Sequence, residues 1–185
     1  ETLETLYGEE DQRIVPQLAY HFDQAGRLEK AIEYTVRAGE LARRTYANDQ
    51  ARQQYEYALS LLETVDPDEI NRRWHLDALS GLGKLCYSTG SVIEAEDYLR
   101  EAVTVGKQLA LDPQEMAILY HWLGEALWWQ DKYEERLRIG KEGLTLIGDD
   151  TESLGAALMT QLIAIGFISI GSESDWVAFT SRTAD

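Results

Sequence analysis

Apolar residues recur along this chain at spacings of three and four residues, which is the period of an amphipathic α-helix. One such helix face is formed by Ala31, Tyr34, Ala38, Leu41 and Ala42. Alternation of apolar and polar residues with a period of two does not persist anywhere, and no Asn-Gly or Asp-Gly hairpin turn occurs. The pattern therefore predicts an all-α fold.

Helix boundaries are marked by Asp-Pro pairs and by glycines. An Asp side chain accepts hydrogen bonds from the first amides of a helix, and Pro fits there because its missing N–H is not needed. Asp66-Pro67 and Asp112-Pro113 therefore predict helix starts, and Gly26, Gly90 and Gly171 predict helix ends. The short connections make neighbouring helices antiparallel. The predicted helices span residues 13–25, 28–45, 49–64, 68–89, 92–110, 113–130, 133–147, 151–170 and 173–183.

A four-position pattern repeats along the chain. Leu79, Leu82, Gly83 and Cys86 are spaced by three, one and three residues. Gly83 and Gly124 lie 41 residues apart, so the period is that of one helix pair per repeat. Other segments with the same spacing are Val15-Leu18-Ala19-Phe22, Tyr120-Leu123-Gly124-Leu127 and Thr160-Ile163-Ala164-Phe167.

The second helix of each pair carries three packing positions of its own. They are filled in a small–large–small order, in which small residues let two helices approach and the large residue fills the gap beside them. The fillings are Ala31-Thr35-Ala38, Ala51-Tyr55-Ala58 and Ala95-Leu99-Ala102, and a weaker match is Arg136-Gly140-Gly143.

These positions resemble the tetratricopeptide (TPR) pattern, most closely over residues 79–102. The resemblance implies a right-handed α-solenoid of antiparallel helix pairs with a repeat near 40 residues, and a role in protein binding. The chain is then a single TPR-like domain over residues 1–185. It comprises irregular repeats at 11–65, regular repeats at 68–110 and 113–147, and a truncated repeat at 151–185.

A narrower resemblance lies in residues 16–34, followed by Arg37-Ala38-Gly39-Glu40 and the Tyr46-Ala47-Asn48 turn. This block is similar to the helical region after the ATPase module of large bacterial signal-transduction ATPases, some with cyclase domains and others with LuxR-type DNA-binding domains. It implies a regulatory domain of a larger cytoplasmic signalling protein. We accordingly expect the chain to be a fragment whose partners include neighbouring domains of its parent, with a possible homodimer through the truncated C-terminal repeat.

Composition narrows the classes of partner. The chain has 17 Lys and Arg against 33 Asp and Glu, a net charge of −16, so its field repels nucleic acid. No apolar run approaches the length of a membrane span. The single cysteine, Cys86, excludes an internal disulfide and fits a reducing cytoplasm.

Candidate binding residues follow from the repeat register. In a stack of helix pairs, the first helices line a concave groove, and residues between their packing positions face into it. Trp128 and Tyr87 are the leading anchors, because aromatic side chains dominate binding hot spots. Alternatively, the tryptophans pack on a neighbouring repeat. The predicted groove residues are Asp77, Lys84, Tyr87, His121, Glu125, Trp128, Trp129 and Gln161.

Catalytic and metal chemistry find no support in the sequence. His21, His75 and His121 have no metal-ligand spacing, so we predict neither a metal site nor a cofactor. Cys86 occupies a packing position and is expected to be buried. Gly81-Leu82-Gly83-Lys84 lacks the spacing and the Ser or Thr of a phosphate loop. The prediction is a non-enzymatic protein-interaction scaffold; the alternative is a small-molecule effector sensor with an aromatic groove.

Overall fold

The structure is a computed structural model that describes residues 14–171. Within this range the secondary structure is helical, without strands, which confirms the predicted all-α fold class. The helices are α2 (Val15–Gln24), α3 (Leu28–Arg44), α4 (Asn48–Leu62), α5 (Glu69–Ser88), α6 (Val92–Gln108), α7 (Pro113–Trp128), α8 (Tyr133–Ile147) and α9 (Leu154–Ile170). These bounds lie within a few residues of those predicted, and the helix predicted at 173–183 lies outside the described residues.

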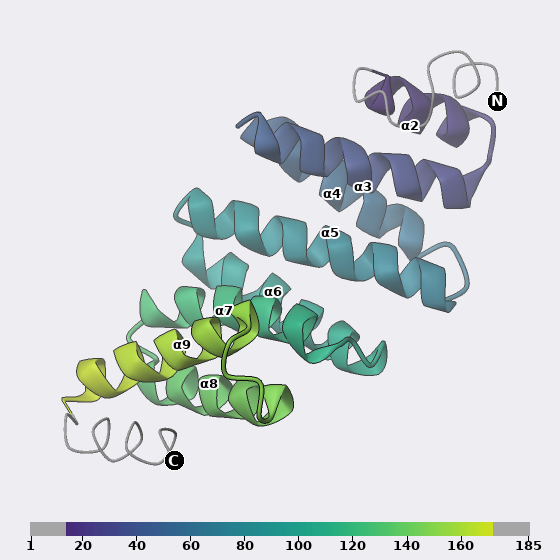
Figure 1. Cartoon of the computed structure of the whole chain (residues 1–185). Coiled ribbons are helices and arrows are strands. Elements are labelled where there is room, and N and C mark those ends of the chain that lie inside the picture. Colours follow the sequence, from purple (N-terminus) through teal and green to yellow (C-terminus); the bar gives the residue numbers. More distant parts are fainter. Residues whose placement is uncertain (1–13, 172–185) are drawn as a thin grey trace. The chain divides into compact units, whose positions relative to one another are not determined.

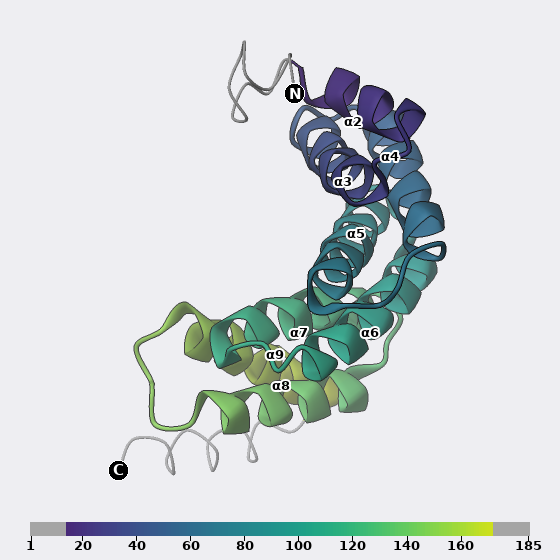
Figure 2. The same ribbon diagram turned by 90° about the vertical axis from the view of Figure 1, so that its right-hand side faces the viewer.

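The chain divides after Thr89 into two compact units, and each is described by itself. Unit 1 contains α2 to α5 and unit 2 contains α6 to α9 (Figure 1). In unit 1, α3 packs against α2, α4 and α5 (Figure 2). In unit 2, α7 packs against α6, α8 and α9.

The core of unit 1 begins with the apolar faces of α2 and α3. Phe22 and Tyr34 stack with ring centroids 5.4 Å apart, and both side chains are buried. Stacked aromatic rings add to the stabilisation from burial alone. Buried apolar residues that join this cluster are Val15, Leu18, Ala19, Ala31, Ile32, Ala38 and Leu61.

Several tight turns have the same backbone conformation. In each, a residue with positive φ follows the helix, and the next amide donates to a carbonyl in the last helical turn. Arg27 N donates to Phe22 O at 2.9 Å after Gly26, and Ala47 N donates to Ala42 O at 2.9 Å after Tyr46. Gly90 and Gly171 also have positive φ, as the sequence predicts for helix ends.

The Asp-Pro starts behave differently from one another. Asp112 caps α7 as predicted, accepting from Gln114 N at 2.8 Å, with Pro113 as the first helical residue. The cap predicted at Asp66 was wrong, because α5 begins at Glu69, one residue after its predicted start, and is capped by Asp68, which accepts from Asn71 N at 2.7 Å. The Asp66 carbonyl instead accepts from Asn71 Nδ2 at 2.8 Å.

Close packing in unit 2 depends on glycines of α7 and α8. A Cβ added at Gly124 would lie 2.5 Å from Leu162 Cδ2, and one at Gly140 would lie 2.9 Å from Ile163 Cγ1. Since non-bonded carbon atoms pack about 3.5 Å apart, a side chain at either position would force side chains of α9 to shift. The glycines therefore fix the position of α9 on the α7–α8 pair.

Candidate functional site

His121, Glu125, Trp128 and Trp129 follow one another at helical spacing along one face of α7, named here the α7 surface. The opposite face carries buried residues, among them Leu123. Trp128 is 36% exposed and Trp129 is 60% exposed. Their rings meet edge to face with centroids 5.0 Å apart. The α7 surface therefore presents both indoles, in contact with each other, at the end of a packed helix.

A buried arginine supports this surface from behind. Arg136 of α8 is 1% exposed and donates from Nη1 to Gly124 O at 2.8 Å and from Nε to Leu162 O at 3.4 Å. Its Nη2 donates to Glu125 Oε1 at 3.0 Å. A planar guanidinium can serve three acceptors at once, which a lysine could not do in this geometry. Arg136 therefore ties α7, α8 and α9 together and holds the Glu125 carboxylate in one orientation.

His121 lies one helical turn before Glu125 and is half-buried. Its Nδ1 is buried and accepts no hydrogen bond from the described residues. Burial lowers the pKa of His121, the charge of Arg136 lowers it further, and Glu125 opposes both effects. The imidazole is therefore neutral at neutral pH.

The remaining predicted groove residues of unit 1 lie on α5. Asp77 pairs with Arg73, one turn earlier, at 3.6 Å. Lys84 is half-buried; burial lowers its pKa, and the charge of Arg43 lowers it further. Tyr87 is half-buried. None of these residues has the exposure of Trp129.

Lys84 belongs to a polar cluster that the sequence analysis missed. Tyr55 Oη donates to Glu40 Oε2 at 3.0 Å, and Arg43 donates to the same carboxylate at 2.8 and 2.9 Å. Burial would raise the pKa of Glu40, but the hydrogen bonds from Arg43 and Tyr55 outweigh it and the pKa is lowered. Burial raises the pKa of Tyr55. The cluster thus holds a charged carboxylate between α3 and α4.

Gln161 lies on the exposed face of α9. No hydrogen bond, ion pair or ring contact joins it to the α7 surface in the described part of unit 2. The structure therefore brings together the predicted residues of α7 and leaves Gln161 apart from them.

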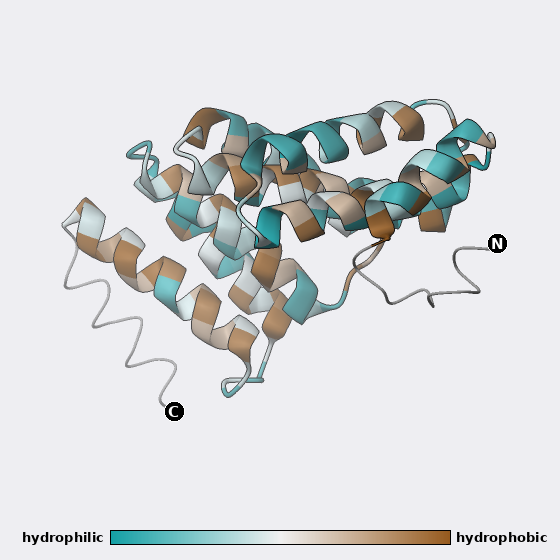
Figure 3. Cartoon of the chain, turned by 90° about the horizontal axis from the view of Figure 1, so that it is seen from above, coloured by the Kyte–Doolittle hydropathy of each residue, from teal (hydrophilic) through white to brown (hydrophobic). Residues whose placement is uncertain are grey.

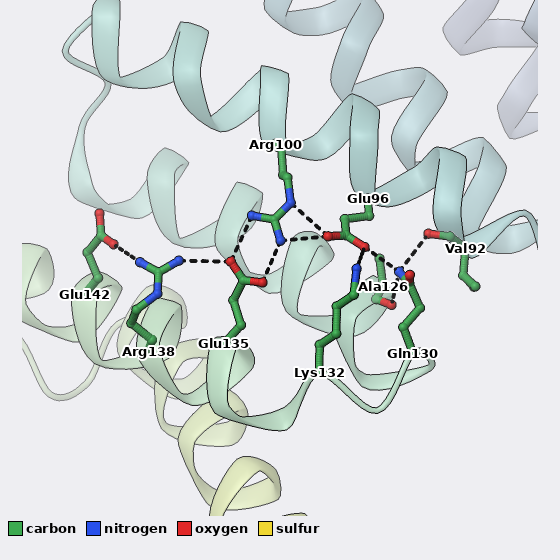
Figure 4. Close-up of polar contacts among 9 residues, drawn as sticks. All are labelled: Val92, Glu96, Arg100, Ala126, Gln130, Lys132, Glu135, Arg138 and Glu142. Carbon is green, nitrogen blue, oxygen red and sulfur yellow. Dashed lines mark hydrogen bonds and ion pairs between the residues drawn. The ribbon is translucent and has the colours of Figure 1, made fainter.

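A belt of ion pairs links α6 to α8 in unit 2 (Figure 4). Glu96, 5% exposed, accepts from Arg100 at 2.7 Å and from Lys132 at 2.5 Å. Arg100 also makes two hydrogen bonds to Glu135, at 2.6 and 2.9 Å. Arg138 continues the belt from Glu135 to Glu142. Burial would raise the pKa of Glu96, but these donors outweigh it and the pKa is lowered.

The belt has a sequence signal that could have been found. The pairs Arg100–Glu135 and Lys107–Glu142 are each 35 residues apart, and Glu96–Lys132 are 36 apart. Opposite charges separated by nearly one repeat on successive second helices predict pairing across the stack. The charged groups of the belt pair with one another. We therefore interpret the belt as a set of ion pairs that joins α6 to α8, and not as a binding site.

Two open cavities are lined by described residues of unit 1. One, of about 670 Å³, lies between α2, α3 and α4 and is lined by Pro16, Leu41, Ala42 and glutamines that include Gln53. The other, of about 580 Å³, lies between the turns before α3 and α5. None of the predicted aromatic residues lines either cavity.

The chemistry of the described residues agrees with the expectations for Cys86 and the glycine-lysine segment. Cys86 is fully buried, and Gly81 to Lys84 lie inside α5. Within residues 14–171 we find no group of three or more histidine, cysteine and acidic residues that could hold a metal ion. In the same range, no helix has both the length and the apolar character needed to cross a bilayer.

Comparison with solved structures shows which known fold this chain resembles. The chain is similar, with a TM-score of 0.54 and 14% identity over 95% of both chains, to a Podosopora anserina protein named as a kinesin light chain with nearly identical TPR-like repeats. A single-substitution variant of that protein gives the same values. No protein-family model and no curated protein matches the chain. The likeness confirms a TPR-like helical repeat fold.

Proposed function

We propose that this chain is a non-enzymatic protein-interaction scaffold and that the α7 surface binds a peptide segment of its partner. The observation that carries the proposal is the pair of exposed, touching indoles of Trp128 and Trp129. Large aromatic side chains in solvent carry an unfavourable apolar surface, and in interfaces they become hot spots because they bury much area at little cost in entropy.

The fixed position of the Glu125 carboxylate supports the proposal. Glu125 lies one turn from Trp128 and is held by Arg136 at 3.0 Å, so the surface offers a fixed carboxylate beside its aromatic anchor. A preorganised polar group loses little freedom on binding. A peptide with an apolar side chain for the indoles and a donor for Glu125 fits this arrangement.

The wider setting is proposed from the block at residues 16–46. That block resembles the region after the ATPase module of bacterial signalling ATPases, so we propose that the chain is a regulatory part of a larger, bacterial, cytoplasmic signalling protein. Sequencing the full reading frame tests this. A Walker motif upstream supports it, and a reading frame without an ATPase module contradicts it.

Peptide binding is tested by selecting a random-peptide display library on the wild-type chain and, in parallel, on Trp128→Ala/Trp129→Ala. Because Trp128 is only 36% exposed, its removal should lower the melting temperature, and a cooperative thermal melt of the variant checks that it still folds. We expect peptides that bind the wild type and bind the variant at least about tenfold more weakly.

A matched control replaces Ile70 of α5 and Ile93 of α6, which are 65% and 68% exposed and are not part of the α7 surface. Their double alanine variant should retain the selected peptides. Enrichment of no peptide, or of peptides that bind both double variants equally, contradicts the proposed site.

A further inference from the structure

Helix α9 is apolar on two faces. It carries no charged residue between Leu154 and Ile170, in a chain of which 27% is charged. One face, with Met159, Leu162, Ile163 and Phe167, is buried. Apolar residues nevertheless extend around the helix along nearly its whole length (Figure 3). A helix of this kind normally has both faces covered.

The outward face has the spacing of a helix-packing seam. Leu154, Leu158, Gln161, Ile165 and Ile168 are separated by four, three, four and three residues. We call these residues the α9 stripe. Leu154 is 65% and Ile168 is 63% exposed, Gln161 is exposed, and Leu158 and Ile165 are half-buried. Alternating steps of three and four are the pattern with which one α-helix packs along another.

The α9 stripe is complementary to itself. Gln161 is its central member, with a leucine pair on one side and an isoleucine pair on the other. When two copies lie antiparallel about Gln161, Leu154 meets Ile168 and Leu158 meets Ile165. The two central amides then face each other, and each can donate an N–H to the carbonyl of the other.

The distribution of charge favours α9 as the place where two copies meet, and it favours antiparallel over parallel packing of the two helices. Two chains of net charge −16 repel each other over most of their surfaces, but α9 contributes no charge to that repulsion. Parallel packing would bring together the two turns that precede α9, each with Asp149, Asp150 and Glu152. Antiparallel packing separates these turns and also opposes the two helix dipoles.

We propose that the chain forms a two-fold symmetric homodimer through antiparallel packing of the α9 stripes about Gln161. This inference does not depend on peptide binding by the α7 surface. A 17-residue helix is about 25 Å long, so the contact is smaller than a standard interface. The dimer should therefore be weak, with a dissociation constant of about 1–100 µM.

Sedimentation equilibrium of the full chain, from about 1 to about 300 µM, measures the dimer directly. Gln161→Lys places two like charges at the two-fold axis and should weaken the dimer at least about tenfold. Thr160→Lys adds the same charge at a neighbouring exposed position off the stripe, and its dissociation constant should equal that of the wild type. Added salt should tighten the wild-type dimer, because it screens the repulsion between the chains.

Cysteine cross-linking with oxidised glutathione tests the register. Gln161→Cys should cross-link to itself, because a disulfide needs its two Cα atoms within about 7 Å. Leu154→Cys should not, because antiparallel packing separates the two positions by about 21 Å along the helix. Cross-linking of both variants, or of neither, contradicts the antiparallel register.

One result overturns the dimer itself. A monomer at every concentration excludes it. If Gln161→Lys also lowers the melting temperature of that monomer, another part of the same chain covers the stripe; an unchanged melting temperature leaves the stripe open to solvent. In either case the second copy is not its partner.

Discussion

Helices α4 and α8 occupy comparable places in the two units and fill the same three packing positions in opposite ways. In α4 the order is small, large, small: Ala51, Tyr55, Ala58. In α8 it is Arg136, Gly140, Gly143, so the large residue has moved to the first position.

In unit 1 the central side chain enters its neighbours. Tyr55 is 1% exposed, and Gly39 of α3 and Gly81 of α5 make room for it. In unit 2 the direction is reversed. Gly140 admits Ile163 and Gly143 admits Met159, both from α9. The total volume between the helices is therefore filled in both units, but the helix that contributes the large side chains differs. A repeat motif fixes the positions of contact more than the residues that occupy them.

The largest expected effect comes from the residue that breaks the motif. Arg136→Ala leaves the carbonyls of Gly124 and Leu162 and the carboxylate of Glu125 without their donor, and it opens a cavity. We expect a loss of about 3–5 kcal/mol in the free energy of unfolding, measured by urea denaturation. Arg138→Ala is the control, because its exposed ion pairs should contribute at most about 1 kcal/mol. Equal losses for the two variants would show that Arg136 is an ordinary surface arginine.

The second-largest expected effect tests the packing of Tyr55 in unit 1, where the large side chain occupies the central position. In Gly81→Ala the new Cβ would lie 2.6 Å from Tyr55 Cε1, so Tyr55 must shift. Overpacking of this kind costs about 1–3 kcal/mol. Combined with Tyr55→Leu, the loss should be smaller than the sum of the two single losses, because the smaller side chain removes the clash. Strictly additive losses in a urea double-mutant cycle contradict the contact.

The helical pattern of the sequence predicts most of the buried residues but not the burial of Arg136. The helical period located the helices and placed Cys86, Leu82 and Leu123 in the core, because burial on one face leaves a regular apolar pattern. The same pattern marked Arg136 as a poor fit but could not predict its burial, since its partners are backbone carbonyls that no side-chain pattern reveals.

The sequence pattern predicts the candidate site only in part, as it does the fold. Spacing placed His121, Glu125 and Trp128 on one face of α7, and the exposure of both tryptophans agrees with an open surface. It did not predict the Glu40–Tyr55 cluster, because that contact depends on the depth to which Tyr55 enters between glycines.

The belt of ion pairs in unit 2 should make its stability sensitive to acid. The pKa of Glu96 in the folded chain lies below its ordinary value of 4.5. Its contribution is therefore present in full above pH 4.5 and is lost as the pH falls through the folded value. Glu96→Gln should cost about 1–3 kcal/mol at pH 7, because hydrogen bonds to charged partners are lost. Its unfolding free energy should fall less steeply below pH 4.5 than that of the wild type; parallel curves would exclude Glu96 as a source of the acid sensitivity.

The smallest effect concerns His121. Its folded pKa lies below the ordinary value of 6.5, so the unfolded chain binds more protons and stability falls as the pH drops below 6.5. His121→Gln should flatten this slope in thermal melts between pH 5 and 7. Glu125→Gln should steepen it, because Glu125 is the group that favours the protonated imidazole. A slope unchanged by both variants would show that His121 is accessible to water in the folded chain.

Whether the α7 surface binds a partner is tested most directly by the indole N–H resonances of the five tryptophans. A 15N-labelled chain is titrated with a peptide selected on the wild type, and each indole is assigned by single substitution. We predict shifts at Trp128 and Trp129 and none at the half-buried Trp74 of unit 1. Shifts at Trp74 while Trp128 and Trp129 stay fixed would contradict the α7 surface as the binding site.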